Sequence, residues 1–122
     1  MHVLLVDDEE ELVSALAERL SFRGMDADWA LSGEAAIKAA RSKHYDVAVL
    51  DMKMPRMGGI DLMHELKDIQ PGMRFIFLTG HGSMRDFKAG TAEAGRAFYL
   101  VKPVPIELLL EKIHEATKTQ ET

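Results

Sequence analysis

The stretch "VAVLDMKMPRMGG", residues 47–59, runs from four apolar residues directly into Asp51 and then into a loop with one proline and two glycines. Four consecutive apolar residues rich in β-branched side chains are typical of a strand that is buried on both faces. The aspartate at its end marks either the point where burial stops or a functional edge of a sheet. The rest of the chain decides between these two interpretations.

Three similar apolar runs indicate further buried strands, namely "VLLV" at 3–6, "FIFL" at 75–78 and "FYLV" at 98–101. A weaker candidate, "MDADWA" at 25–30, alternates apolar residues with acids. Alternation of this kind predicts a strand at the edge of a sheet, where one side is exposed to water.

Helical patterns separate these strands. Apolar residues recur at helical spacing in four stretches: Leu12, Leu16 and Leu20; Ala35, Ala36, Ile37, Ala39 and Ala40; Ile60, Met63, Leu66 and Ile69; and Ile106, Leu109, Leu110 and Ile113. The segment 83–94 is helical by composition and has a weaker pattern, with Gly90 inside it. The order is therefore β-α five times over, which predicts an α/β fold with an open parallel sheet, right-handed crossovers and helices on both faces.

Length and composition limit the class of protein. A chain of 122 residues fits one domain, and 47% hydrophobic with 29% charged residues is typical of a globular protein. The net charge of -5 argues against general binding of nucleic acid or anionic membrane, so we expect a protein partner. The chain has no cysteine, and no apolar run approaches the roughly 18 residues of a membrane span. We expect a cytoplasmic protein.

Each of the four strong strands is followed at once by a polar residue that can take part in chemistry. The first strand leads into Asp7 and Asp8, and the others into Asp51, Thr79 and Lys102. In a parallel sheet these ends lie on the same edge, where ligands bind. We therefore expect three carboxylates, a hydroxyl and an ammonium group to converge.

The converging groups predict phosphoryl chemistry. Three carboxylates repel one another unless a cation or Lys102 compensates. An all-oxygen site suits Mg²⁺, which commonly completes its coordination with waters and phosphate oxygens. Asp51 is then placed to act as a carboxylate nucleophile that forms an aspartyl-phosphate. Lys102 would neutralise charge on the transferring group, and Thr79 would donate a hydrogen bond to it.

The motif residues Asp7-Asp8, Asp51, Thr79 and Lys102-Pro103, with Tyr99 three residues before the lysine, resemble the receiver domain of bacterial response regulators in two-component signalling. The resemblance covers nearly the whole chain. It implies a flavodoxin-like (βα)5 doubly wound fold, with five parallel strands in the order 2-1-3-4-5. It also implies a signalling domain, rather than an enzyme, that promotes its own phosphorylation and dephosphorylation.

The resemblance assigns roles at the proposed Mg²⁺ site. Asp51 corresponds to the phospho-acceptor and Asp8 to a direct Mg²⁺ ligand. Asp7 would hold the metal through water, and the backbone carbonyl of Lys53 would supply another ligand. The side chains of Lys53 and His81 lie at positions that tune how fast the acyl phosphate hydrolyses in this family.

The resemblance also assigns a switch. Thr79 corresponds to the switch hydroxyl, and Lys102 to the lysine that pairs with the phosphoryl group. The peptide bond from Lys102 to Pro103 is expected to be cis. Tyr99 corresponds to an aromatic residue that turns inward when Thr79 moves toward the phosphate, so that phosphorylation biases a two-state equilibrium.

The implied partners are a sensor histidine kinase or phosphotransfer protein, and an output domain or downstream protein. The family also forms phosphorylation-dependent homodimers through the fourth helix, fifth strand and fifth helix. We expect a receiver domain over residues 1–118, followed by a polar tail at 119–122 that resembles the start of a linker. We expect no direct binding of nucleic acid or membrane by this domain.

Other interpretations remain open at this point. Glu9 to Glu11 are interpreted as a solvated acidic helix start, because acids in the first turn interact well with the helix dipole. A metal-dependent phosphohydrolase would also use an aspartyl nucleophile, but its usual second acid, two residues later, is replaced by Lys53. A flavin-binding module would need a phosphate-binding loop after the first strand, where "DDEEE" stands instead.

Overall fold

A five-stranded parallel sheet forms the centre of the molecule in the computed structural model, which describes residues 1–80 and 98–118. The strands are β1 (His2–Val6), β2 (Asp26–Ala30), β3 (Val47–Asp51), β4 (Arg74–Thr79) and β5 (Phe98–Val101). Their order is β2-β1-β3-β4-β5, and each neighbouring pair is parallel. The expected strand order 2-1-3-4-5 is confirmed.

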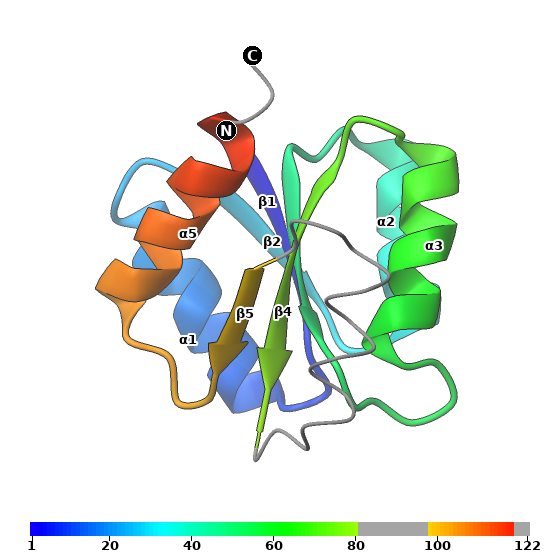
Figure 1. Cartoon of the computed structure of the whole chain (residues 1–122), viewed down its shortest axis with the longest axis horizontal. Helices are drawn as coiled ribbons and strands as arrows, with labels where there is room; N and C mark the ends of the chain where they lie inside the picture. Colours follow the sequence, from blue (N-terminus) through cyan, green and yellow to red (C-terminus); the bar gives the residue numbers. More distant parts are fainter. Residues whose placement is uncertain (81–97, 119–122) are drawn as a thin grey trace.

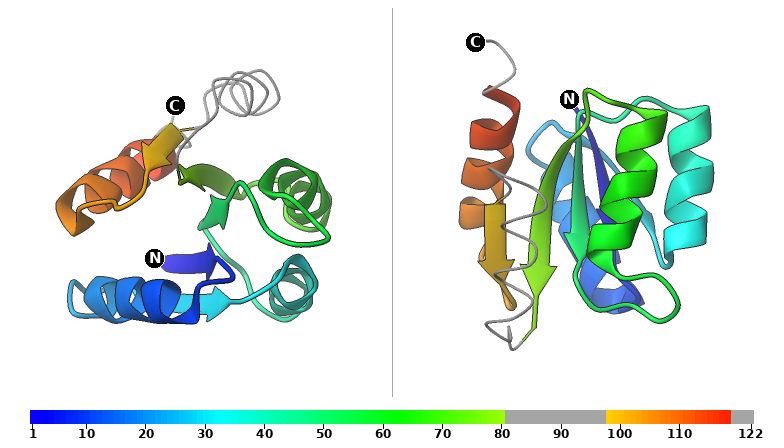
Figure 2. Two further views of the ribbon diagram at one scale, coloured as in Figure 1. Left: turned by 90° about the horizontal axis from the view of Figure 1, so that it is seen from below. Right: turned by 45° about the vertical axis from the view of Figure 1, so that its right-hand side comes forward.

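The described helices cover both faces of the sheet. They are α1 (Glu10–Ser21), α2 (Gly33–Ser42), α3 (Gly59–Ile69) and α5 (Ile106–Lys118). Helices α1 and α5 lie on one face, and α2 and α3 lie on the other (Figures 1 and 2). The expected helix at 83–94 and the expected tail at 119–122 lie outside the described residues.

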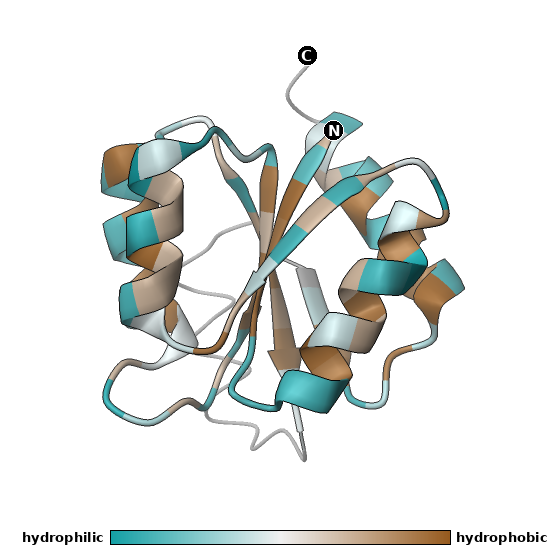
Figure 3. Cartoon of the chain, turned by 180° about the vertical axis from the view of Figure 1, so that it is seen from behind, coloured by the Kyte–Doolittle hydropathy of each residue, from teal (hydrophilic) through white to brown (hydrophobic). Residues whose placement is uncertain are grey.

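The central strands are hydrophobic because both of their faces are covered. Every residue of β3 is buried, and so are four of the five residues of β1. Alternate side chains join two separate apolar clusters, so that Leu5 and Val49 face α1 and α5 while Leu4 and Leu50 face α2 and α3. Figure 3 shows hydrophobic residues along the central strands, while the helices carry hydrophobic and hydrophilic residues in alternation.

Strand β2 is the edge strand that its alternating pattern predicts. Met25 and Ala27 pack against the cluster beneath α1 and α5, while the side chain of Trp29 is 41% exposed. Asp26 and Asp28 lie on the opposite face of the strand, in register with His2 and Leu4. The acids on this edge discourage pairing with a further strand.

Two contacts fix the helices on the α2 and α3 face. The side-chain amide of Gln70 donates to the carbonyls of Ala40 and Lys43, both at 2.7 Å, and its oxygen accepts from the Tyr45 amide. At the other end of α2, a Cβ atom at Gly33 would lie 2.8 Å from the sulfur of Met57. One end of α2 is thus held by Gln70, which directly follows α3, and the other end lies against Met57 in the loop between β3 and α3.

Within residues 1–80 and 98–118, no helix combines the length and the apolar character that crossing a membrane requires.

Candidate functional site

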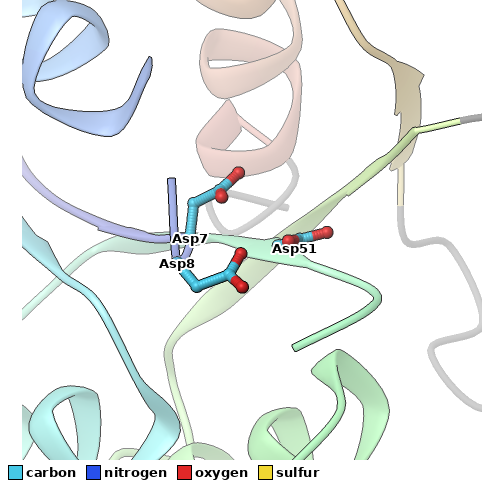
Figure 4. Close-up of side chains that lie close together, drawn as sticks. All are labelled: Asp7, Asp8 and Asp51. Atoms are coloured by element: carbon cyan, nitrogen blue, oxygen red, sulfur yellow. The ribbon is translucent and has the colours of Figure 1, made fainter. Parts of the chain in front are cut away.

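The polar residues that follow the strands converge at one edge of the sheet. Asp7 and Asp8 follow β1, Asp51 is the last residue of β3, and each offers a carboxylate oxygen within 4.8 Å of the others. Figure 4 shows the three side chains gathered at the ends of these strands. Thr79 ends the neighbouring strand β4, and Lys102 directly follows β5. The expected convergence is therefore present in the structure.

Asp51 is a buried carboxylate, with 4% of its surface exposed. Its Oδ1 accepts a hydrogen bond from the Lys53 amide at 3.2 Å, and its Oδ2 lies 3.5 Å from the Lys102 ammonium. Burial raises the pKa of Asp51 and the nearby Asp7 adds to this effect, while the Lys53 amide and Lys102 oppose it. The net direction is upward, so this carboxylate is held in a setting that disfavours its charge.

Asp7 is more deeply buried than Asp51 and is fixed by the backbone. Its amide donates to the Ala30 carbonyl at 3.1 Å, and its Oδ1 accepts from the Glu9 amide at 2.9 Å. Its Oδ2 lies 2.7 Å from the Lys102 nitrogen without forming a well-aligned hydrogen bond. Asp8, by contrast, is exposed. The cluster thus combines one solvent-facing and two buried carboxylates.

Lys102 is the cation of this cluster, and its side chain is 14% exposed. Its amide donates to the Thr79 carbonyl at 2.8 Å, and the peptide bond to Pro103 is cis. Burial lowers the pKa of Lys102, but its close contacts with the carboxylates of Asp7, Asp51 and Glu9 outweigh burial and raise it. Lys102 is therefore an ammonium group across the physiological range.

Tyr99 lies on β5 with a half-buried side chain. Its ring stacks on Phe77 with centroids 5.3 Å apart, and its hydroxyl donates to the sulfur of Met52 at 3.8 Å. Met52 directly follows Asp51, so the ring is linked to the end of β3. Thr79, a residue of the neighbouring strand β4, is 4% exposed.

A close approach of α3 supports the end of β3. The Gly59 amide donates to the Met52 carbonyl at 3.1 Å, and a Cβ atom at Gly59 would lie only 2.7 Å from the carbonyl oxygen of Asp51. Any larger residue would push the first turn of α3 away from the backbone that carries Asp51. Gly59 therefore fixes the position of this carboxylate without touching it.

The donor set of this edge fits a hard divalent cation. Asp7, Asp8 and Asp51 offer only oxygen atoms, and an all-oxygen set suits Mg²⁺ better than metals that prefer sulfur or imidazole. One oxygen of the buried Asp7 has no well-aligned hydrogen-bond partner, although it is fully shielded from solvent. A cation would compensate the mutual repulsion of the three carboxylates more completely than Lys102 alone.

Two predicted positions are less defined than the others. Lys53 is exposed in the loop after β3, where its amide is bonded to Asp51. His81 lies outside the described residues.

The sequence pattern does not predict the contact between Glu9 and Lys102. It indicates only that Glu9 belongs to a solvated helix start. Glu9 does lie at the start of α1, but its carboxylate also lies 3.2 Å from the Lys102 nitrogen.

Residues 3–114 match the response regulator receiver domain family. The chain belongs to this family. The receiver domain is 36% identical over 115 residues to the transcriptional regulatory protein GlrR of Escherichia coli, an alignment that covers 94% of this chain and 26% of GlrR. It spans less than half the length of three further curated relatives, among them the probable transcriptional regulatory protein TcrX of Mycobacterium tuberculosis.

Solved structures share the fold of this receiver domain. A CheY-like receiver domain protein from Methanospirillum hungatei superposes with a TM-score of 0.89 at 29% identity, covering 98% of this chain and 95% of that one. A response regulator from Burkholderia pseudomallei, solved with a phosphorylated aspartic acid and a calcium ion, has a TM-score of 0.84 at 28% identity. That alignment covers 98% of this chain and 71% of the other. The sheet order and these likenesses agree on a flavodoxin-like receiver fold.

Proposed function

We propose that this receiver domain takes part in phosphorelay signalling by accepting a phosphoryl group on Asp51 from a sensor histidine kinase or a phosphotransfer protein. The observation that carries the proposal is the placement of one buried carboxylate, at the end of the central strand β3, beside a partly buried ammonium and two further carboxylates. The Burkholderia relative, with its phosphorylated aspartate and bound calcium, supports the same chemistry here. The family match favours this function over the phosphohydrolase and the flavin-binding module.

The transfer is a nucleophilic displacement at phosphorus. A carboxylate oxygen of Asp51 forms a bond to phosphorus while the bond from phosphorus to the donor's imidazole nitrogen breaks, and the leaving imidazole keeps that electron pair. Asp51 reacts as the anion, a form that burial disfavours and that the Lys53 amide and Lys102 partly restore. Lys102, 3.5 Å from Asp51, neutralises charge on the phosphoryl oxygens.

Asp7, Asp8 and Asp51 are proposed to hold Mg²⁺, with Asp7 acting through water and the Lys53 carbonyl as a further ligand. When bound, this ion supplies a positive charge that offsets the anionic oxygens. The side chains of Lys53 and His81 are proposed to tune the hydrolysis of the acyl phosphate.

Thr79 and Tyr99 are proposed to convert phosphorylation into a change of surface. The Thr79 hydroxyl would move to donate to a phosphoryl oxygen, and Tyr99 would follow it inward. The stack on Phe77 and the contact with Met52 show that the ring already has partners on the inner side. Phosphorylation would thus shift an existing equilibrium.

The remaining roles concern the whole protein. We propose a receiver domain over residues 1–118 and a linker that starts at 119–122, with an output domain or a separate downstream protein as the recipient of the signal. We also propose that the domain forms a phosphorylation-dependent homodimer and that the protein is cytoplasmic. The domain would not turn over a substrate as an enzyme does, and it would not bind nucleic acid directly.

The first test is covalent labelling. Incubation with acetyl phosphate and Mg²⁺ should add one phosphoryl group at Asp51, seen by intact mass and peptide mapping. Asp51→Asn should stay unlabelled, while Asp28→Asn, which removes a half-exposed aspartate of β2, should label normally. Phosphate on another residue, or repeated turnover of an external phosphomonoester, would overturn the proposal.

A further inference from the structure

Glu9 occupies the N-cap of α1, although it is not a residue type that caps helices well. Its backbone is extended, with φ -89° and ψ 94°, and its side chain makes no hydrogen bond to the first turn. Ser, Thr, Asp and Asn are preferred at this position because their short side chains accept from the free amides of that turn. In α2, by contrast, the Ser32 side chain accepts from the Ala35 amide. The N-cap of α1 is therefore not optimised for helix stability.

The Glu9 carboxylate instead contacts Lys102, the residue that follows β5. Its Oε1 accepts from the Lys102 nitrogen at 3.2 Å, a contact between residues 93 positions apart in the chain. The Glu9 amide at the same time donates to Asp7, which fixes the base of the side chain. In the described part of the chain, the side chains of the adjacent Glu10 and Glu11 make no such contact.

The distances around the Lys102 nitrogen show where this contact holds it. The nitrogen lies 2.7 Å from Asp7, 3.2 Å from Glu9 and 3.5 Å from Asp51. The nitrogen is thus held most closely by the two residues that follow β1, and Asp51, the proposed phospho-acceptor, is the most distant of these three carboxylates. A turn of the ammonium toward a phosphoryl group on Asp51 would move it away from Glu9 and lengthen that contact.

We propose that Glu9 is a positioning residue that restrains Lys102 and thereby slows the phosphorylation of Asp51. This inference rests on the proposed function of the domain. The Glu9 side chain is 63% exposed, so its ion pair is weak and shifts an equilibrium by only about two- to five-fold. A weak restraint of this kind sets a rate without blocking the reaction.

The decisive experiment compares Glu9→Gln with Glu10→Gln. Both variants remove one negative charge from the start of α1, but only the first releases Lys102. With acetyl phosphate and Mg²⁺, the initial rate of Asp51 labelling should rise about three-fold in Glu9→Gln. It should stay within about 1.5-fold of the unaltered protein in Glu10→Gln, because that charge is solvated and screened.

Two further measurements separate this role from a structural one. Glu9→Asn restores a good helix cap, so it should raise both the labelling rate and the midpoint of thermal unfolding. The side-chain nitrogen signal of Lys102, followed by NMR in ¹⁵N-lysine protein, should shift in Glu9→Gln and not in Glu10→Gln. A labelling rate that is unchanged in Glu9→Gln, or raised equally in Glu10→Gln, overturns the inference. Failure of the unaltered protein to label at Asp51 would instead overturn the proposed function itself.

Discussion

The molecule contains two clusters in which aspartates surround one lysine, and they differ in almost every other respect. In the edge cluster (His2, Asp26, Asp28, Lys43 and Tyr45), the Lys43 nitrogen lies 2.9 Å from Asp28 and 3.2 Å from Asp26. The Tyr45 hydroxyl donates to Asp28 at 2.7 Å, and the His2 ring nitrogen lies 2.7 Å from Asp26. The carboxylates of this cluster are half-exposed. Asp28 accepts well-aligned hydrogen bonds from Lys43 and Tyr45 and Asp26 accepts one from Lys43, whereas the close His2 contact is not a well-aligned hydrogen bond.

The proposed acceptor cluster (Asp7, Asp8, Asp51 and Lys102) has three carboxylates, of which Asp7 and Asp51 are buried, and Lys102 is its one side-chain donor among the described residues. The pKa of Asp51 in this cluster is shifted in the opposite direction to that of Asp28 in the edge cluster. Burial raises the pKa of Asp28, but hydrogen bonds from Lys43 and Tyr45 outweigh burial and lower it, whereas the pKa of Asp51 is raised. Residue types alone therefore do not distinguish a stabilising ion pair from a reactive site. Burial and the number of side-chain donors distinguish the two. A ligand is expected where buried carboxylates outnumber the side-chain donors beside them.

Separate substitution of each lysine should show the difference between the two clusters most clearly. Lys102→Ala should slow the labelling of Asp51 by acetyl phosphate about 100-fold, because it removes a preorganised positive charge beside the transferring group. Lys43→Ala should label at the normal rate and lose thermal stability instead. Initial labelling rates and thermal melts, both recorded with Mg²⁺, measure these two effects.

A Lys102→Ala protein with a folded circular dichroism spectrum and normal labelling would show that Lys102 has no role in the transfer. Slow labelling in Lys43→Ala would show that the edge cluster contributes to the reaction.

Magnesium should stabilise only through the acceptor cluster. An ion that binds the folded state alone raises the free energy of unfolding by about 1.4 kcal/mol at ten times its dissociation constant. Thermal melts with increasing Mg²⁺ should therefore shift upward for the unaltered protein and for Asp28→Asn. In Asp8→Asn the shift should be smaller at every concentration, since a proposed ligand is lost. Equal shifts in Asp8→Asn would exclude that aspartate as a ligand.

The opposite pKa directions predict opposite effects of two matched substitutions on stability. The folded-state pKa of Asp51 lies above its ordinary value of 3.8, so its contribution to stability falls as the pH rises from 3.8 through the folded-state pKa. Asp51→Asn should thus be more stable at pH 7 without Mg²⁺, by about 1 kcal/mol. The advantage should shrink toward pH 3.

Asp28 should behave in the reverse way. Its contribution is present above its ordinary value of 3.8 and is lost as the pH falls through the lowered folded-state pKa. Asp28→Asn should therefore be less stable at pH 7, by a smaller amount because the side chain is 40% exposed and screened. Urea unfolding at several pH values measures both effects, and shifts of the same sign would contradict the assignment.

The sequence predicts the sheet because each strong strand is a continuous apolar run that ends at a polar residue. Since the strands of such a sheet are parallel, that pattern alone places the ends of β1, β3, β4 and β5 on one edge. The edge position of β2 also follows from its alternation, because acids such as Asp26 cannot be covered on both faces. The fold and the identity of the acceptor cluster are therefore encoded in local patterns.

Contacts between side chains from distant elements could not be predicted in this way. Glu9 has the composition of an ordinary solvated helix start, and only the three-dimensional path of β5 brings Lys102 within its reach. The hydrogen bond from Tyr99 to Met52 and the hydrogen bond from Gln70 to Ala40 likewise depend on how far apart the packed elements lie. A glutamate at a position that favours short capping residues was the single signal available for Glu9.

The close approach of Gly33 and Met57 couples the first residue of α2 to the loop that follows β3. A Cβ atom at residue 33 would lie 2.8 Å from the Met57 sulfur, so the Met57 side chain would have to shift to make room for it. We expect the two positions to vary together among relatives, with a larger residue at 33 accompanied by a smaller one at 57. Paired substitution would then recover what each single change loses, and the start of α2 would constrain how the loop after Asp51 can evolve.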